Sequence, residues 1–378
     1  MKGEGKRILV APLNWGLGHA SRCIPLVNSL LEHGFEPVLA GDGASLDLLA
    51  SEFPLLRTYE LPSYGIRYSR TPELFKFKLL SQGAKIAKAM SGEHKKVQEI
   101  VSKESASGIL SDNRFGVWSK QVPSVYLTHQ LNVEAGWMSS PASRWHQSII
   151  SNFDRCWVCD FKGEESLAGS LSSNPGKLKN VEWIGPLSRF SKAGEEAIIT
   201  TKQSRKTIDI GVVLSGPEPS RSQFEKKVIE VLKGRKEKVV LVRGVIRPSE
   251  ETAAESQSSQ IEQNLTIYDF MLSNELEELL RQSRILIMRS GYSSIMDLYA
   301  LGSKALLMPT PGQSEQEYLA DRMQQKGWFP TVRQNEFNWS SIRGALDYPW
   351  AEMKKTSKSF DYATLFDVFL QGNRIFLR

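Results

Sequence analysis

The sequence has few cysteines and no long apolar run, and each shortage excludes a class of protein. Its 378 residues include only 3 cysteines, too few for a disulfide framework, so a reduced, cytoplasmic protein is expected. No apolar run approaches the roughly 18 residues that a membrane-spanning helix needs. The first residues pass from charged side chains directly into a short strand-like run and lack the apolar stretch of a signal peptide. We therefore expect a cytoplasmic protein that does not cross a bilayer.

Clusters of metal ligands are also missing from the sequence. The chain has no Asp-x-Asp pair and no His-x-x-x-His pair. Cys156 and Cys159 have the spacing of a redox or zinc pair, but they lie in a predicted strand and no second pair exists to complete a zinc site. We expect neither a metal nor a cofactor.

What the chain does contain is the pattern of a folded α/β protein. It is 40% hydrophobic and 24% charged, and its length favours two or three domains. Near its start, a β-rich run at 7–11, a glycine loop, apolar residues at helical spacing over 24–31 and a second β-rich run at 35–40 follow one another. This βαβ order predicts a parallel sheet with helices on its faces.

The same pattern starts again after a polar stretch. Residues 188–206 have no apolar period over most of their length, so we place a linker there, between a domain of residues 1–187 and a domain of residues 207–360. An amphipathic segment within 361–378 is expected to form a C-terminal helix that packs back on the first domain. We predict two Rossmann-like domains that face each other across a cleft.

The net charge of +6 is concentrated in one segment. Between residues 67 and 103 there are 9 lysines and arginines against 3 glutamates, so the rest of the chain is close to neutral. Such a segment indicates an acidic partner, either a nucleotide-linked substrate, an anionic membrane surface or nucleic acid. The alternative is a solvated helix face with no partner.

A glycine loop between the first strand and the first helix is the first candidate site. In Gly16-Leu-Gly-His19, backbone N–H groups and the positive end of the helix favour an anion, but the third glycine of a dinucleotide fingerprint is missing. His19 is a candidate general base, and Asp112, in the loop after a predicted strand, is a candidate to orient it. The alternatives are a packing histidine and an Asp-Asn surface turn.

Two further loops carry polar groups suited to a nucleotide sugar. Ser290-Gly291 ends a predicted strand and begins a helix, so its N–H groups can hold a diphosphate, and Asp297 lies two turns further on, where it can bind ribose hydroxyls. Gln316 and Glu317 offer an amide and a carboxylate to sugar hydroxyls. After an earlier strand, His129 to Asn132 can line the same cleft.

These motifs resemble those of GT-B nucleotide-sugar glycosyltransferases. The similarity is greatest to the group that contains the lipid-linked GlcNAc transferase of peptidoglycan synthesis, and within it to a branch that begins with a Gly-Leu-Gly-His loop. The resemblance implies an N-terminal acceptor domain, a C-terminal UDP-sugar domain, and UDP-sugar as a substrate with no cofactor. The donor-side residues expected from the motifs and the resemblance are Gly18, Arg189, Ser215, Gly216, Phe270, Met271, Arg289, Ser290, Gly291, Asp297, Gln316 and Glu317. Those on the acceptor side are Asn14, His129 and Asn132, with His19 and Asp112 as catalytic residues.

Within this resemblance, each candidate group has an expected role. The uracil lies near Phe270 and Met271, and the diphosphate lies between Ser215-Gly216 and Ser290-Gly291. Two departures affect base and sugar preference: Asp297 stands where the family more often has Glu, and Pro217 stands where a polar residue is common.

The expected reaction is an inverting, metal-independent transfer from a UDP-sugar to an acceptor hydroxyl, which a lipid can carry. One alternative is a UDP-sugar hydrolase, because the same loop resembles that of the hydrolase of pseudaminic acid synthesis. Another is a non-catalytic sugar-nucleotide-binding protein at the membrane surface. Apolar residues and lysines mix between Pro72 and Met90, as in a helix that lies on an anionic bilayer, so we expect peripheral membrane contact through 67–103 or a plain covering helix. Nucleic acid is not an expected partner.

Overall fold

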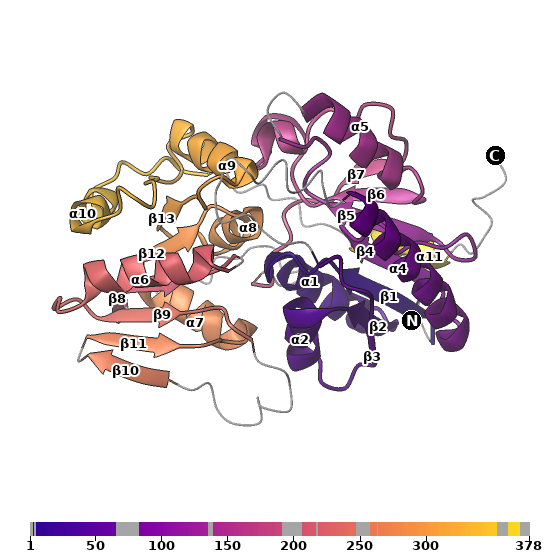
Figure 1. Ribbon diagram of the computed structural model, residues 1–378, viewed down its shortest axis with the longest axis horizontal. Helices are drawn as coiled ribbons and strands as arrows, with labels where there is room; N and C mark the ends of the chain where they lie inside the picture. The colour runs from indigo at the N-terminus through magenta and orange to yellow at the C-terminus, as the bar shows by residue number, and fades with distance from the viewer. Residues whose placement is uncertain are drawn as a thin grey trace.

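The structure is a computed structural model that describes residues 3, 5–65, 83–134, 139–190, 206–216, 218–246, 258–262, 264–353 and 362–370. Two α/β lobes, each built around its own sheet, lie side by side (Figure 1). The predicted fold class is therefore confirmed.

The N-terminal sheet has 7 strands in the order β3-β2-β1-β4-β5-β6-β7, and every strand pair in it is parallel. Its central strands are almost wholly buried, since helices cover both faces. The strands are β1 (Arg7–Pro12), β2 (Glu36–Gly41), β3 (Thr58–Glu60), β4 (Gly108–Asp112), β5 (Ser124–Thr128), β6 (Arg155–Val158) and β7 (Val181–Trp183). The helices are α1 (Gly18–Glu32), α2 (Gly43–Glu52), α4 (Gly83–Glu104) and α5 (Ser139–Ile150).

The C-terminal sheet has 6 strands in the order β10-β11-β9-β8-β12-β13, of which only the edge strand β10 runs antiparallel to its neighbour. The strands are β8 (Ile208–Val213), β9 (Val239–Val242), β10 (Ser258–Glu262), β11 (Leu265–Tyr268), β12 (Ser283–Arg289) and β13 (Ala305–Met308). The helices are α6 (Ser220–Leu232), α7 (Ser273–Gln282), α8 (Tyr292–Leu301), α9 (Ser314–Gln325) and α10 (Trp339–Leu346).

Each sheet reverses its strand order at one place, and this positions the candidate loops. The reversal lies between β1 and β4 in the first sheet and between β8 and β12 in the second. In open α/β sheets, ligands bind outside the carboxyl ends of the strands at such a switch point. Asp112 lies at the end of β4, and His19, Ser215 and Ser290 lie in the segments that follow β1, β8 and β12.

The C-terminal helix α11 (Tyr362–Leu370) packs on the N-terminal domain. Its Phe366 and Phe369 are both buried and make edge contacts with Phe35, at ring distances of 5.7 and 6.5 Å. Gly108 lies directly under the Phe369 ring, which a Cβ at that position would meet. Between the domains, residues 191–205 of the expected linker lie outside the described residues.

The basic segment is described only from residue 83 onward, so residues 67–82, with Lys76 and Lys78, lie outside the described residues. In the described part, Ile86 and Val97 are buried in the domain, whereas Lys85 and Lys88 are exposed. Over these residues, α4 covers the domain with its apolar side chains and has lysines on its outer face. No helix among the described residues is both long enough and apolar enough to cross a membrane.

Candidate active site

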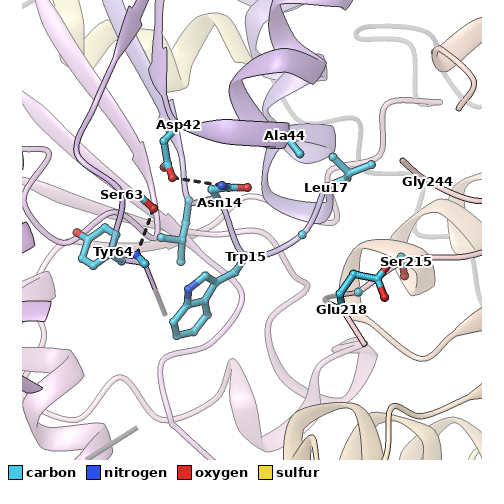
Figure 2. A pocket seen from close by; sticks show the side chains of 14 residues that line it. Asn14, Trp15, Leu17, Asp42, Ala44, Ser63, Tyr64, Ser215, Glu218 and Gly244 are labelled. Carbon is cyan, nitrogen blue, oxygen red and sulfur yellow. Dashed lines mark hydrogen bonds between the residues drawn. The ribbon is translucent and has the colours of Figure 1, made fainter. Parts of the chain in front are cut away.

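A cleft of about 470 Å³ lies between the two domains. The residues on its N-terminal side follow β1, β2 and β3, and those on its C-terminal side follow β8 and β9 (Figure 2). The lining residues are Leu13, Asn14, Trp15, Gly16, Leu17, Asp42, Ala44, Ser63, Tyr64, Gly65, Ser215, Gly216, Glu218 and Gly244. Three residues expected at a substrate site, Asn14, Ser215 and Gly216, are among them.

His19, on the first turn of α1, is bonded to Asp112 at the end of β4. The distance between His19 Nδ1 and Asp112 Oδ1 is 2.8 Å. Arg22, one helical turn beyond His19, donates two hydrogen bonds to the same carboxylate through Nε and Nη2. Asp112 and Arg22 are buried, at 0% and 2% exposure of their side chains, and His19 keeps 15%. The fold thus brings together the two predicted catalytic residues and adds Arg22, to which sequence reasoning gave no role.

The electrostatics of this cluster keep the imidazole neutral and the carboxyl ionised. Burial lowers the pKa of His19 from its usual 6.5, and the Asp112 charge opposes this only in part. Burial by itself would raise the pKa of Asp112, but the charge of Arg22 and the hydrogen bonds with Arg22 and His19 outweigh it and lower that pKa. Nδ1 of His19 also lies 2.9 Å from Arg22 Nη2, a donor, so its two neighbours favour different tautomers. In the tautomer with the proton on Nδ1, donated to Asp112, Nε2 is free to accept a proton, as a general base requires.

His129, in the loop after β5, connects this cluster to the other domain. Arg22 Nη1 lies 2.8 Å from His129 Nδ1. Since a guanidinium has only donors, Nδ1 accepts, and Nε2 carries the hydrogen that it donates to Glu315 Oε1 at 2.9 Å. The imidazole also stacks on the Tyr292 ring of α8, with 4.4 Å between centroids and 3° between planes.

Glu315 is a site residue that sequence reasoning missed. It lies in the first turn of α9, next to the predicted Gln316, but its partner His129 is 186 positions away. Burial would raise the pKa of Glu315, but the electrostatic interaction and hydrogen bond with the His129 side chain outweigh burial and lower that pKa. The sequence held one indication of this role: Glu315 is an acidic residue at the start of a helix, beside the predicted Gln316.

The N-termini of α1 and α8 meet at the domain interface. A Cβ at Gly18, the first residue of α1, would lie 2.4 Å from the Ser293 hydroxyl oxygen of α8, so the two helices approach closely here. Neither helix has a side-chain hydrogen bond at its N-cap, and the same holds for α9. Helix N-termini without side-chain caps leave backbone N–H groups for an anion.

The other donor-side candidates of this region are held by intramolecular bonds. The Ser290 hydroxyl donates to the Gln316 carbonyl oxygen at 2.8 Å, and the Gln316 side chain accepts from the Thr310 N–H at 2.9 Å. Gly291 is the N-cap of α8. The exposed Glu317 accepts from the Gly312 N–H at 2.9 Å. These bonds shape the loops at the ends of β12 and β13.

Asp297, the residue expected to bind ribose, faces the segment that leaves the first domain. Its carboxylate accepts a hydrogen bond from Ser188 at 2.6 Å and is 7% exposed. Burial raises its pKa to about 6, against the opposing charge of Arg189. Arg189 lies with its guanidinium 5.1 Å from the centre of the Phe190 ring. The ribose role of Asp297 stays a prediction.

Apart from Asn14, Ser215 and Gly216, the expected site residues, His19 and Asp112 included, are not in the cleft lining. Four of them make contacts away from the cluster around His19. Arg289 is fully buried over the Phe224 ring and donates to the Pro309 and Ser220 carbonyl oxygens and to Gln334. Burial lowers its pKa to about 9. Asn132 donates to the carbonyl oxygens of Ser170 and Ser173. Phe270 and Met271 are partly buried against the core. The structure thus shows local structural contacts for all four.

Comparison with known proteins identifies the C-terminal half. Residues 215–358 match the glycosyltransferase family 28 C-terminal domain. The chain is 22% identical over 336 residues to an uncharacterized glycosyltransferase of Methanosarcina mazei, which covers 85% of this chain and 84% of the relative. A second protein of that name from the same organism is 23% identical over 338 residues and covers 85% of each chain.

Solved structures agree on the fold. A spinosyn rhamnosyltransferase superposes with a TM-score of 0.58 at 16% identity, over 96% of both chains. A calicheamicin glycosyltransferase gives a TM-score of 0.57 at 13% identity, over 99% of this chain and 96% of the other. The chain has the GT-B fold. Its family 28 domain and its glycosyltransferase relatives make it a glycosyltransferase. The narrower resemblance to the GlcNAc transferase of peptidoglycan synthesis stays a prediction for this glycosyltransferase.

Proposed function

We propose that this glycosyltransferase moves a sugar from a UDP-sugar to an acceptor hydroxyl by a single, inverting displacement that needs no metal ion. The observation that carries the proposal is the His19–Asp112 hydrogen bond at the start of α1, beside the N-terminus of α8. A neutral, oriented imidazole and uncapped helix N-termini are the two groups that such a reaction requires.

In the proposed step, Nε2 of His19 takes the proton of the acceptor hydroxyl. The acceptor oxygen forms a bond to the anomeric carbon as the bond from that carbon to the diphosphate oxygen breaks, so configuration inverts and UDP leaves. Asp112 stabilises the imidazolium that forms, as a carboxylate does beside other catalytic imidazoles. Arg22 holds Asp112 ionised and in position.

Backbone N–H groups stabilise the charge that develops on the leaving diphosphate. Ser215 and Gly216, after β8, line the cleft on the donor-domain side, and Gly216 has a φ of +100° that favours glycine. The N-termini of α1 and α8 add positive potential from both domains. A neighbouring rhamnosyltransferase structure is described as a complex with thymidine diphosphate, which supports a nucleoside diphosphate as the leaving group here.

A nucleotide-binding experiment with a turnover assay tests the proposal. We expect UDP to raise the melting temperature by mass action and to bind in calorimetry. TDP and GDP serve as the comparison set, because they share the diphosphate and differ in the base. With a UDP-sugar panel, release of UDP that depends on an added acceptor supports transfer, whereas equal release without an acceptor supports the hydrolase. No stabilisation by any nucleotide would overturn the proposed donor and favour an interaction protein.

The proposal includes a lipid-linked acceptor and peripheral contact with an anionic membrane. Sedimentation with anionic but not neutral vesicles, lost at high salt, supports them. Absence of sedimentation at low salt would leave a water-soluble acceptor.

A further inference from the structure

The acceptor-domain side of the cleft presents an exposed aromatic ring. Trp15, in the loop after β1, is 39% exposed and lines the cleft. Figure 2 shows its indole projecting from the loop, with Tyr64 on one side and Glu218 of the other domain on the other. Of the large apolar side chains that are exposed in the described part of the chain, the others are Leu31, Leu55, Trp145 and Leu272, and none of these lines the cleft. An exposed indole in a cleft is a contact surface for a ligand.

Beside this ring lies a set of polar groups whose hydrogen-bonding directions are fixed. Asn14 Nδ2 donates to Asp42 Oδ2 at 3.2 Å, so the Asn14 carbonyl oxygen is left as an acceptor. The Ser63 hydroxyl oxygen accepts from the Gly65 N–H at 3.2 Å, which leaves its hydrogen to donate. Asp42 itself keeps acceptor capacity, because a carboxylate has about four lone-pair sites.

A buried ion-pair network behind the cleft holds these groups rigid. Arg114, fully buried, donates to Asp42 Oδ1 at 2.6 Å and pairs with the equally buried Glu93. Glu93 also accepts from the Tyr64 hydroxyl at 2.5 Å. The charge of Arg114 is thus shared between two carboxylates, and the cleft residues Asp42 and Tyr64 are fixed from within the domain.

We propose that the acceptor is a carbohydrate, one sugar ring of which stacks on Trp15 while its hydroxyls bind Asn14, Asp42 and Ser63. The inference rests on the proposed transfer reaction and names the class of its acceptor. A pyranose has C–H groups on its faces and hydroxyls around its rim, which matches an electron-rich indole face beside fixed donors and acceptors. An alkyl chain in the same place would leave those polar groups without partners, which is costly.

Ligand-observed NMR on the full chain tests the proposal with two sets of probes. The first is a mixture of the methyl glycosides of glucose, galactose, mannose and N-acetylglucosamine. The second is octanol and citronellol, as stand-ins for lipid alcohols. We expect saturation transfer to the ring protons of at least one glycoside and none to the alcohols. Affinity for that glycoside falls about tenfold or more in Trp15→Ala and in Asn14→Ala, the loss that removal of one ring or hydrogen-bond contact gives.

Trp145→Ala is the matched control, since Trp145 is 51% exposed on α5 and outside the cleft lining. It retains glycoside binding. Circular dichroism and melting curves establish that each variant is folded. Absence of binding by every glycoside, binding of the alcohols instead, or equal losses in Trp15→Ala and Trp145→Ala would each overturn the proposal. UDP calorimetry on the same wild-type sample distinguishes failure of this proposal from failure of the proposed function. UDP binding without glycoside binding supports the proposed donor and contradicts only the carbohydrate acceptor.

Discussion

Nε2 of His129 in the N-terminal domain lies 2.9 Å from Oε1 of Glu315 in the C-terminal domain. Because His129 is also bonded to Arg22, which contacts His19, this contact joins the C-terminal domain to the cluster around His19. Ring stacking on Tyr292 and the Tyr292 hydroxyl bond to the Cys159 carbonyl oxygen, at 2.8 Å, add to the same junction. The hydrogen-bonded cluster around His19 therefore includes groups from both domains.

Replacement of Glu315 tests this dependence. We expect Glu315→Ala to lower kcat/KM by about 10- to 100-fold, because the His129 N–H loses its charged acceptor at a largely buried site. Glu315→Gln retains more activity, since the amide oxygen still accepts. Steady-state UDP release measures both, and Asp321→Asn on the exposed face of the same helix is the control. Activity of Glu315→Ala equal to that of the control would mean that the contact has no part in turnover.

The pH profile of the same reaction reports on His19. Burial lowers the pKa of His19, and the base acts only when neutral, so the acid limb of kcat/KM is expected below pH 6.5. Asp112→Asn removes a charge that raises this pKa, so the limb moves to still lower pH. It also removes the carboxylate that fixes the tautomer and lowers turnover by about 100-fold or more.

His19→Ala is the companion variant, with a similar loss of turnover and nearly unchanged UDP affinity, because the base acts in the transition state. An acid limb above pH 6.5 in the wild type, or a shift to higher pH in Asp112→Asn, would contradict the assignment.

Asp297 gives a prediction that combines stability and binding. Burial raises its pKa to about 6 in the folded protein, from 3.8. The folded state therefore binds more protons between these values, so stability from this group is present at low pH and lost as pH rises through about 6. At high pH the ionised carboxyl therefore lowers the free energy of unfolding by up to roughly 3 kcal/mol, at ~1.4 kcal/mol for each pKa unit. Asp297→Asn removes this destabilisation.

Melting curves at several pH values measure the effect. The variant is expected to exceed the wild type in stability at pH 8 and to match it near pH 4. Calorimetry with UDP on Asp297→Ala tests the separate ribose role, for which affinity falls by about 1–3 kcal/mol. Unchanged UDP affinity with the expected stability change would restrict Asp297 to its Ser188 contact.

Sequence patterns were sufficient for the features that depend on neighbours along the chain. The strand, glycine loop and helix around His19 follow from local apolar spacing, and so does the position of Asp112 at the end of a strand. The roles of Arg22 and Glu315 depend on partners 90 and 186 positions away, which no local pattern encodes. Burial also depends on distant parts of the chain and cannot be predicted from a local pattern. Arg289 ends a strand beside a candidate loop, yet its side chain is fully buried over the Phe224 ring.

Gly18 offers the most direct test of domain contact. A Cβ there would lie 2.4 Å from the Ser293 hydroxyl oxygen, so Gly18→Ala requires either that this hydroxyl turns away or that α1 and α8 separate. Separation would disturb both the cluster around His19 and the two helix N-termini. We expect a loss of about tenfold or more in kcat, because displacements of about 1 Å at such a site are costly. The sheet and helices of each domain are unchanged by this substitution, so circular dichroism is expected to stay the same.

The second change in this test is Ser293→Ala, which removes the colliding oxygen. In the double variant Gly18→Ala/Ser293→Ala, the remaining approach is between two methyl groups, at 3.2 Å before any adjustment, which small shifts of the helices relieve. Activity is therefore expected to recover in large part, and Ser293→Ala alone to remain near the wild type. A coupling energy from this double-mutant cycle that is close to zero would show that the two helices do not need to approach for turnover. Recovery, in contrast, would establish that the closed arrangement of the two domains is the one in which His19 works.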